Sequence, residues 1–154
     1  MTTSLYNRKD TREYLAAQLS TAITGAQAVY DHQPADIGGG SPVITVHSDG
    51  TEAHFGGDGY NPHAFYFWIS IYVLRIDPGT AWEEAGAEDI LDTIEHDVRE
   101  WIVNHAGPTY NATPVKVWDT LIPEPGAVSE AGYLVIGKEQ YRTERFRVVA
   151  MIKD

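Results

Sequence analysis

The sequence predicts an α+β fold in which two amphipathic helices pack on an antiparallel or mixed sheet of about four to five strands. Three observations predict it. Apolar residues recur at helical spacing in two segments, residues 10–30 and 80–105. A run of twelve mostly bulky apolar residues, FYFWISIYVLRI at 65–76, lies between them, and shorter β-prone runs follow the second segment. The 154 residues suit one compact domain that spans 1–154.

The first helix is predicted from Asp10 to Tyr30. Its apolar residues are spaced three or four apart, which places them on one helical face: Leu15, Leu19, Ala22, Ile23, Ala26 and Tyr30. Gly25 weakens this helix, and Pro34 prevents it from continuing into the mid-thirties.

A first strand is predicted from Pro42 to His47, where VITVH is rich in β-branched residues. The following segment, 47–62, contains many Gly, Asp and Asn residues and few side chains suited to a core. We therefore expect a long loop, mobile in the isolated subunit.

The run from Phe65 to Ile76 is expected to be a central strand because both of its faces are bulky. One face is mainly aliphatic and carries Phe65, Phe67, Ile69, Ile71 and Val73. The other face is mainly aromatic and carries Tyr66, Trp68, Tyr72 and Leu74. An aromatic second face favours partial exposure or contact with another subunit, so Tyr66, Trp68 and Tyr72 are candidate interface residues.

The second helix is predicted to begin at the capping pair Thr80 and Glu83, or one turn later because of Gly86. Gly107-Pro108 ends it. One stripe is expected to be buried: Leu91, Ile94, Val98, Trp101, Ile102 and His105. Carboxylates occupy the opposite face.

Three strands are predicted to finish the chain, at 115–121, 133–137 and 144–152. A long connection, 107–132, is expected around the first of them. In the last strand, alternation turns Arg145 and Arg147 outward. The residues expected to face inward are Phe146, Val148, Ala150 and Ile152.

The composition disfavours several classes of function. Asp and Glu total 22 against 11 Lys and Arg, a formal charge of -11, which disfavours nucleic-acid binding because phosphates need counter-charge. With no cysteine, thiolate chemistry and thiolate zinc sites are excluded. No apolar run approaches the roughly 20 residues that cross a bilayer, and the first residues lack the apolar core of a signal peptide. We expect a protein made in a cytosol, with no membrane partner.

No residue set has the spacing of a catalytic, cofactor or metal site, and we expect a non-enzymatic protein without a cofactor. One group of His and Asp residues lies in the Gly-rich segment, at His47, Asp49, His54, Asp58 and His63. Its spacing matches no compact ligand motif. The Gly38-Gly39-Gly40 run lacks the Lys and Ser/Thr of a phosphate loop.

Opposite charges gather in two places and suggest a contact between subunits. Acidic residues crowd the outer face of the second helix, among them Glu88, Asp92 and Glu95, and cations gather near the chain's end, at Arg142, Arg145 and Arg147. A ring needs a head-to-tail contact between two different surfaces. We hypothesise that these arginines face those carboxylates on the adjacent subunit; the alternative is that both are ordinary solvated faces.

The order of these features resembles the lambda-like phage tail terminator family. The segments that carry the resemblance are VYDHQPADIGGGSPVITV after the first helix, NPHAFYFWISIYVLR, the acidic helix AEDILDTIEHDVREWIVNH, and YRTERFRVVAMI at the end. Together they span most of the chain, and the similarity is one of pattern and order. Segments 47–62 and 107–132 are longer than the plainest members of that family would have.

The resemblance implies a virion subunit that forms a ring, a hexamer, on the last ring of the tail tube. Such a ring stops tube growth and joins the tail to the head or neck. Its implied partners are other copies of itself, the tail tube protein and a head-tail connector or neck protein. Two alternatives stay open: another head-tail connector or stopper, and a small cytosolic enzyme or ligand-binding domain whose pocket forms only in three dimensions.

Overall fold

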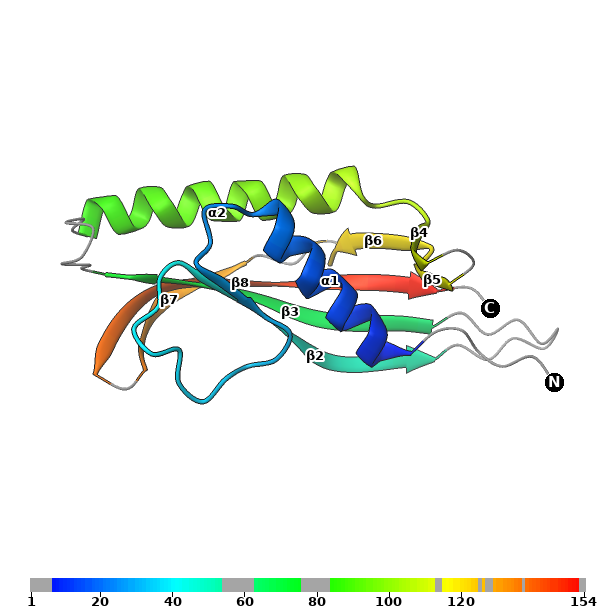
Figure 1. Ribbon diagram of the computed structural model, residues 1–154, viewed down its shortest axis with the longest axis horizontal. Coiled ribbons are helices and arrows are strands. Elements are labelled where there is room, and N and C mark those ends of the chain that lie inside the picture. The colour runs from blue at the N-terminus through cyan, green and yellow to red at the C-terminus, as the bar shows by residue number, and fades with distance from the viewer. Residues whose placement is uncertain are drawn as a thin grey trace, which may run out of the picture.

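The computed structural model describes residues 7–53, 63–75, 84–112, 115–124, 126, 129–136 and 138–152. Two helices, α1 (Arg8–Ala22) and α2 (Glu84–Asn104), pack on a mixed six-stranded sheet (Figure 1). A separate two-stranded sheet contains β4 (Thr109–Ala112) and β5 (Val115–Trp118). The predicted α+β class is confirmed, but there are more strands than the four to five expected.

The large sheet has the order β1-β2-β3-β8-β6, and β7 also pairs with β8. Its strands are β1 (Ala28–Tyr30), β2 (Val43–Ala53), β3 (His63–Leu74), β6 (Thr120–Pro123), β7 (Glu130–Ile136) and β8 (Glu139–Ile152). Only β1 and β2 are parallel. Strand β3 pairs with residues 141–152 of β8 along one edge of that strand. On the other edge of β8, β7 pairs with residues 139–145 and β6 with residues 148–151.

The main core lies between the helices and one face of the sheet. The strand predicted to be central is β3, whose Phe67, Ile69 and Ile71 are fully buried among residues of both helices. Its second face contributes Tyr72 and Leu74 to a separate buried cluster, so the predicted division of its two faces is confirmed. The inward residues predicted for the last strand also belong to the main core: Phe146, Val148, Ala150 and Ile152.

Helix α1 is shorter than predicted. It ends at Ala22, where the Ile23 amide donates to the Leu19 carbonyl at 2.8 Å, and the chain then turns into β1. At Gly25 an added Cβ would lie 3.1 Å from the Ile94 side chain of α2, so the glycine allows the turn to approach that helix. Residues 26 and 30, expected on the helical stripe, lie beyond the helix.

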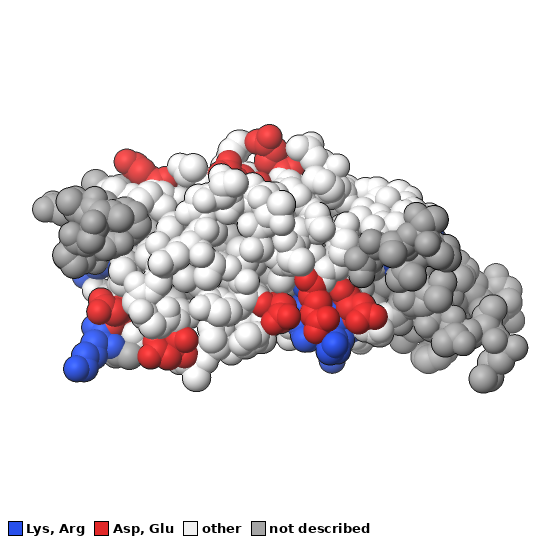
Figure 2. Space-filling model, in the orientation of Figure 1, with Lys and Arg blue, Asp and Glu red and all other residues white. Residues whose placement is uncertain are grey.

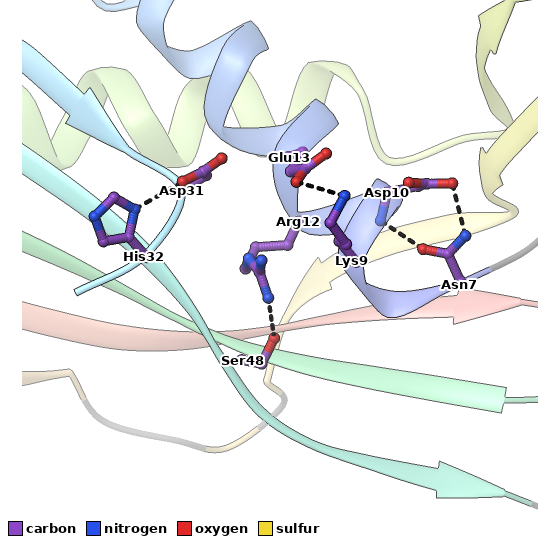
Figure 3. A network of polar contacts seen from close by, with 8 residues as sticks. All are labelled: Asn7, Lys9, Asp10, Arg12, Glu13, Asp31, His32 and Ser48. Carbon is purple, nitrogen blue, oxygen red and sulfur yellow. Dashed lines mark hydrogen bonds and ion pairs between the residues drawn. The ribbon is translucent and has the colours of Figure 1, made fainter. Parts of the chain in front are cut away.

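Figure 3 shows how α1 begins and how it is attached to the sheet. The Asn7 side chain accepts a hydrogen bond from the Asp10 amide at 2.7 Å, which satisfies a free donor of the first turn. Arg12 Nη1 donates to Ser48 Oγ of β2 at 3.2 Å. On the buried side, Thr11 Oγ1 donates to the Val117 carbonyl at 3.0 Å. The helix is therefore joined to both sheets.

In α2 the predicted stripe is buried except at its end. Leu91, Ile94, Val98, Trp101 and Ile102 belong to the core. His105 was predicted to be buried, which is wrong, because α2 ends at Asn104 and the imidazole is exposed. Its ring stacks on Trp101 with 4.1 Å between ring centroids.

Both segments expected as long connections contain strands. Residues 47–53 of the first belong to β2, and 54–62 lie outside the described residues. A register shift between Ser48 and Thr51 contains Gly50, whose φ of 110° favours glycine. The second segment, 107–132, includes β4, β5, β6 and the start of β7. The turn-forming residues there separate short strands.

A candidate interaction surface

The sheet face opposite the helices carries aromatic rings beside arginines. In the strand registers Trp68 of β3 lies between His47 of β2 and Arg147 of β8, and Ser70 lies between Thr45 and Arg145. Tyr66 and Trp68 are partly buried. We define the arginine–aromatic surface as these two rings, the two arginines and the carboxylates that bind the arginines and Tyr66: Tyr66, Trp68, Arg145, Arg147, Asp49, Glu52, Glu124 and Glu130.

Arg147 is the most highly connected residue of this surface. Its Nε donates to Glu124 at 2.7 Å, a second nitrogen also binds Glu124, and Nη1 donates to Asp49 at 2.9 Å. The guanidinium carbon lies 4.8 Å from the Tyr66 ring centroid. The hydrogen bonds from Arg147 lower the pKa of the Glu124 carboxyl, and those two carboxylates raise the pKa of Arg147. Asp49, one of the two carboxylates that bind Arg147, lies within the register shift between Ser48 and Thr51.

Arg145 and Tyr66 extend the network on either side. The Arg145 guanidinium carbon lies 4.4 Å from the Trp68 ring centroid, and its Nε donates to Glu130 of β7 at 2.6 Å. Tyr66 donates its hydroxyl to Glu52 of β2 at 2.8 Å, which raises the pKa of Tyr66 because a phenolate would lose that bond. Tyr66 and Trp68 are therefore held in place by groups from three other strands, β2, β7 and β8, and from the residue after β6.

The third aromatic candidate, Tyr72, belongs to the second core cluster instead. It is 4% exposed and meets Tyr141 edge to face, with 6.2 Å between ring centroids. The segment after β1 covers this end of the sheet with Ile37. Of the three rings predicted at an interface, two are accessible and Tyr72 is not.

Each of the three arginines predicted to pair with a neighbour's carboxylates has a carboxylate partner in its own chain, and the contact between subunits stays a prediction. Arg142 lies on the helix side of the sheet and pairs with Glu88 of α2 in its own chain. Arg145 and Arg147 pair with Glu130, Glu124 and Asp49, also in their own chain. The strand alternation that predicted outward arginines could not show that neighbouring strands bring carboxylates to them.

The acidic face of α2 lies apart from Arg145 and Arg147, because α2 packs on the other side of the sheet. Asp92 is exposed on that face, and Glu95 pairs with Arg99 one turn later. Arg99 also lies over the Phe146 ring, 4.5 Å from its centroid. Between the three predicted arginines and the three predicted carboxylates of α2, the only ion pair within the described part of one subunit is that of Arg142 with Glu88.

Charge is absent from a broad part of the surface. In the view of Figure 2, where α1 crosses the middle, acidic side chains lie along α2 at the top and mixed charges lie at the lower edge, with an uncharged area between. Exposed residues of the second half of α1 and the following turn are small and neutral: Ala17, Ser20, Thr21, Ala22 and Thr24. The first half of α1 is charged and carries Arg8, Lys9, Asp10, Arg12 and Glu13. In a chain with a charge of -11, the uncharged area is where another subunit could approach with least repulsion.

A shallow hollow of about 220 Å³ lies beside Ser70. Ser70 is the small residue in a row of bulky ones on this side of β3, and Tyr72, His47 and Arg145 line the hollow with it. The His47 Nδ1 is buried without a hydrogen-bond partner among the described residues. Burial lowers the pKa of His47, with Arg145 adding to this effect and Asp49 opposing it. The imidazole is thus neutral near pH 7 and can both donate and accept one hydrogen bond.

The His and Asp group noted in the Gly-rich segment is divided by the structure. His47 and Asp49 lie on β2, where Asp49 binds Arg147. His54 and Asp58 lie outside the described residues, and the side chain of His63 is not described. Across the described part of the chain, no three His, Asp or Glu side chains are grouped so that they could hold a metal ion. None of the described helices is long and apolar enough to cross a membrane.

Sequence reasoning missed the carboxylates that hold the surface together. Glu124 follows β6, and Glu130 begins β7 opposite Arg145. The close spacing of YLVI and YRTER across Gly137-Lys138 was a signal for a hairpin that would pair Glu130 with Arg145. Neither models of known protein families nor curated proteins match the chain.

Proposed function

We propose that this chain is a structural virion subunit, a tail terminator that forms a ring, caps the tail tube, stops its growth and joins the tail to the head or neck. The observation that carries the proposal is the arginine–aromatic surface, because accessible Tyr, Trp and Arg side chains are the groups most enriched where proteins bind one another. Trp68 with Arg145 and Tyr66 with Arg147 are its anchors.

The contacts of this surface support a docking role. A side chain that is already fixed loses less conformational freedom when a partner binds, so binding is tighter for the same area. Arg147 is held by two carboxylates, and Arg145 by Glu130 and the Trp68 ring. The surface thus presents rigid aromatic edges to its partner, for which the tail tube protein or a neck protein is the candidate.

The assignment to a tail terminator is supported by the order of elements. A first helix, a strand, a long central strand, an acidic helix and a closing strand occur in the order that the resemblance requires. Subunits in such a ring would meet at the uncharged area beside the second half of α1, since each carries a charge of -11. We place the ring in the virion at the tail–neck junction, assembled from chains made in the host cytoplasm.

The direct test measures tail tube growth. Purified tube protein is polymerised with and without the chain, and tube lengths are read by electron microscopy. The proposal predicts shorter tubes with a cap on one end, and loss of this effect in Trp68→Ala. Val103→Ala, a change at a side chain that is 68% exposed at the end of α2, is the matched control. Equal tube lengths with and without the folded wild-type chain would refute the proposal.

The hollow beside Ser70 is the one observation that favours a ligand-binding domain instead. Its lining combines a neutral imidazole, hydroxyl groups and an arginine. Mass spectrometry of the native purified protein separates the two functions. A bound metabolite that leaves in Ser70→Leu, which fills the hollow, would favour ligand binding over a role in the tail.

A further inference from the structure

The hollow beside Ser70 exists because of the row of residues that crosses the sheet there. In the strand registers Ser70 lies between Thr45 of β2 and Arg145 of β8. Its neighbours on this face of β3 are the large rings of Trp68 and Tyr72, so a small side chain between them leaves a gap. The Arg145 guanidinium does not fill the gap, because it lies over the Trp68 ring, 4.4 Å from the centroid. The space above Ser70 therefore stays open.

This row is polar where packing alone would favour apolar side chains. Thr45 is 1% exposed and Ser70 is 5% exposed. Thr45 Oγ1 has no hydrogen-bond partner among the described residues, and the same is true of Nδ1 of His47, which lines the hollow. A buried polar group without a partner costs free energy, and valine would fill the place of Thr45 without that cost. The polar row therefore indicates a binding role in addition to packing.

Arg145 brings a charge to the hollow and has donors that its own chain does not use. Its Nε donates to Glu130 at 2.6 Å, and within the described part of the chain its guanidinium makes no other hydrogen bond. The terminal nitrogens of a guanidinium form a planar fork that matches the two oxygens of a carboxylate. The bond to Glu130 and the contact with Trp68 hold this fork in place before a ligand arrives.

The size of the hollow limits what it can hold. Its volume of about 220 Å³ exceeds the roughly 150 Å³ of a cavity that takes up benzene, and it is below the roughly 300 Å³ at which pockets for drug-sized ligands begin. A nucleotide or a large cofactor does not fit such a space. Leu134 and Tyr72 make part of the lining apolar, which suits a short hydrocarbon stem.

We propose that the hollow beside Ser70 binds a carboxylate group carried on a short apolar stem. The fork of Arg145 is its main contact, and the hydroxyls of Ser70 and Thr143, which line the same hollow, are further donors. Glu130 keeps its bond to Nε, so the guanidinium bridges two carboxylates. The carboxylate of Glu144, which also borders the hollow, already accepts a hydrogen bond from Ser129 at 2.7 Å.

Two sources can bring such a group to the hollow: a free small acid, and an Asp or Glu side chain of a partner protein. The carboxylate is the shared chemistry, and its binding can be measured on the isolated chain. The inference therefore does not rest on the proposed function. Tube capping can fail while the carboxylate binds, and the carboxylate can fail to bind while capping is intact.

An NMR titration of the folded chain with sodium propionate tests the proposal. The amide signals of Ser70, Thr143 and Arg145 should shift together and saturate, with a Kd of about 1 to 10 mM, as expected for so small a ligand. Propionamide has the same shape without the charge and should shift these signals much less. Sodium chloride at the same concentration controls for ionic strength, because Arg145 is half exposed.

Two variants locate the site. Arg145→Gln removes the fork and should weaken propionate binding about 10- to 100-fold, since hydrogen bonds to a charged group are lost. Lys9→Gln removes one positive charge from an exposed residue of α1 and is the matched control, in which binding should be unchanged. Ser70→Leu fills the hollow but keeps the fork, and it should abolish binding. This second variant keeps the test decisive if Arg145→Gln folds poorly.

A blocked amino acid separates the two sources. N-acetylglutamate N-methylamide presents the same carboxylate on a side chain whose backbone stays outside the hollow. Equal affinity for this compound and for propionate would support the proposal with an acidic side chain of a partner protein as the occupant. Binding of propionate alone, together with an acid retained by the purified chain in native mass spectrometry, would support it with a free acid.

Three outcomes would overturn the proposal. The first is the absence of a saturable shift with propionate, and the second is an equal response to propionamide. The third is propionate binding that neither Arg145→Gln nor Ser70→Leu changes, which would place the bound propionate elsewhere on the chain.

Discussion

The guanidinium of Arg145 lies 4.4 Å from the centroid of the Trp68 ring while its Nε donates to Glu130. One cation thus links the central strand β3, its neighbour β8 and the edge strand β7. Arg147 makes the corresponding link from Tyr66 and Trp68 to Asp49 and Glu124. The surface proposed to bind other subunits is also part of what holds the sheet together.

Replacing Arg147 with Ala should lower the free energy of unfolding by about 1 to 2 kcal/mol, because hydrogen bonds to charged groups and a cation–π contact are lost from a partly exposed site. The free energy of unfolding of Arg147→Lys should lie between those of wild type and Arg147→Ala, since lysine keeps the charge but not the forked geometry of the guanidinium. Urea unfolding measures both. Equal stability of wild type and Arg147→Ala would show that these bonds contribute nothing.

Acidification should weaken the Arg147–Glu124 pair. The pKa of Glu124 is lowered in the folded protein from its ordinary value of 4.5, so its ionised form stabilises the fold above that pH. That contribution is lost as pH falls through the folded-state pKa. The stability difference between wild type and Glu124→Gln should therefore be present at pH 7 and shrink below pH 4.5. A difference that is constant from pH 7 to pH 3 would contradict this.

His47 should make stability depend on pH in a higher range. Its pKa is lowered by burial from 6.5, so below pH 6.5 the unfolded chain binds a proton that the folded chain resists. Wild-type stability should fall from pH 7 toward pH 5, and His47→Gln should reduce this slope. An NMR titration gives the imidazole pKa itself, and a value above 6.5 would reverse the expected sign.

The Trp118→Phe change should be among the more destabilising single changes in the core. Trp118 is fully buried, contacts Tyr14 and Trp101 edge to face, and donates Nε1–H to the His105 carbonyl at 3.1 Å. We expect a loss of about 1 to 3 kcal/mol from the smaller ring and the missing hydrogen bond. Thermal unfolding should measure this loss of stability. The control is Val103→Ala, whose stability should stay within about 0.5 kcal/mol of wild type.

Periodicity was enough to predict both helices and the two faces of β3. In β3, nine of the ten residues from Phe65 to Leu74 are bulky and only Ser70 is small and polar, which is why a central position could be predicted. The extent of α1 could not be predicted, because Ala26 and Tyr30 fit the helical stripe although they lie past its end. What ends the helix is a tertiary arrangement, with Gly25 against Ile94 and β1 beside β2.

The candidate site was predicted in part. Tyr66, Trp68, Arg145 and Arg147 do share one face, because period-two alternation is a local property. Their partners are not local: Asp49 is ninety-eight residues from Arg147, and Glu124 is reached only because β6 pairs with β8. Tyr72 resembles Trp68 in sequence, but a covering segment that contains Ile37 buries it. Such contacts depend on topology and cannot be inferred from spacing.

The most direct measurement of the central claim is cryo-electron microscopy of tail tubes mixed with the folded chain. We predict a ring of this subunit on one end of each tube, with the strands that carry Trp68 and Arg147 at a protein contact. Tubes with bare ends, or the chain bound along their sides, would contradict the account.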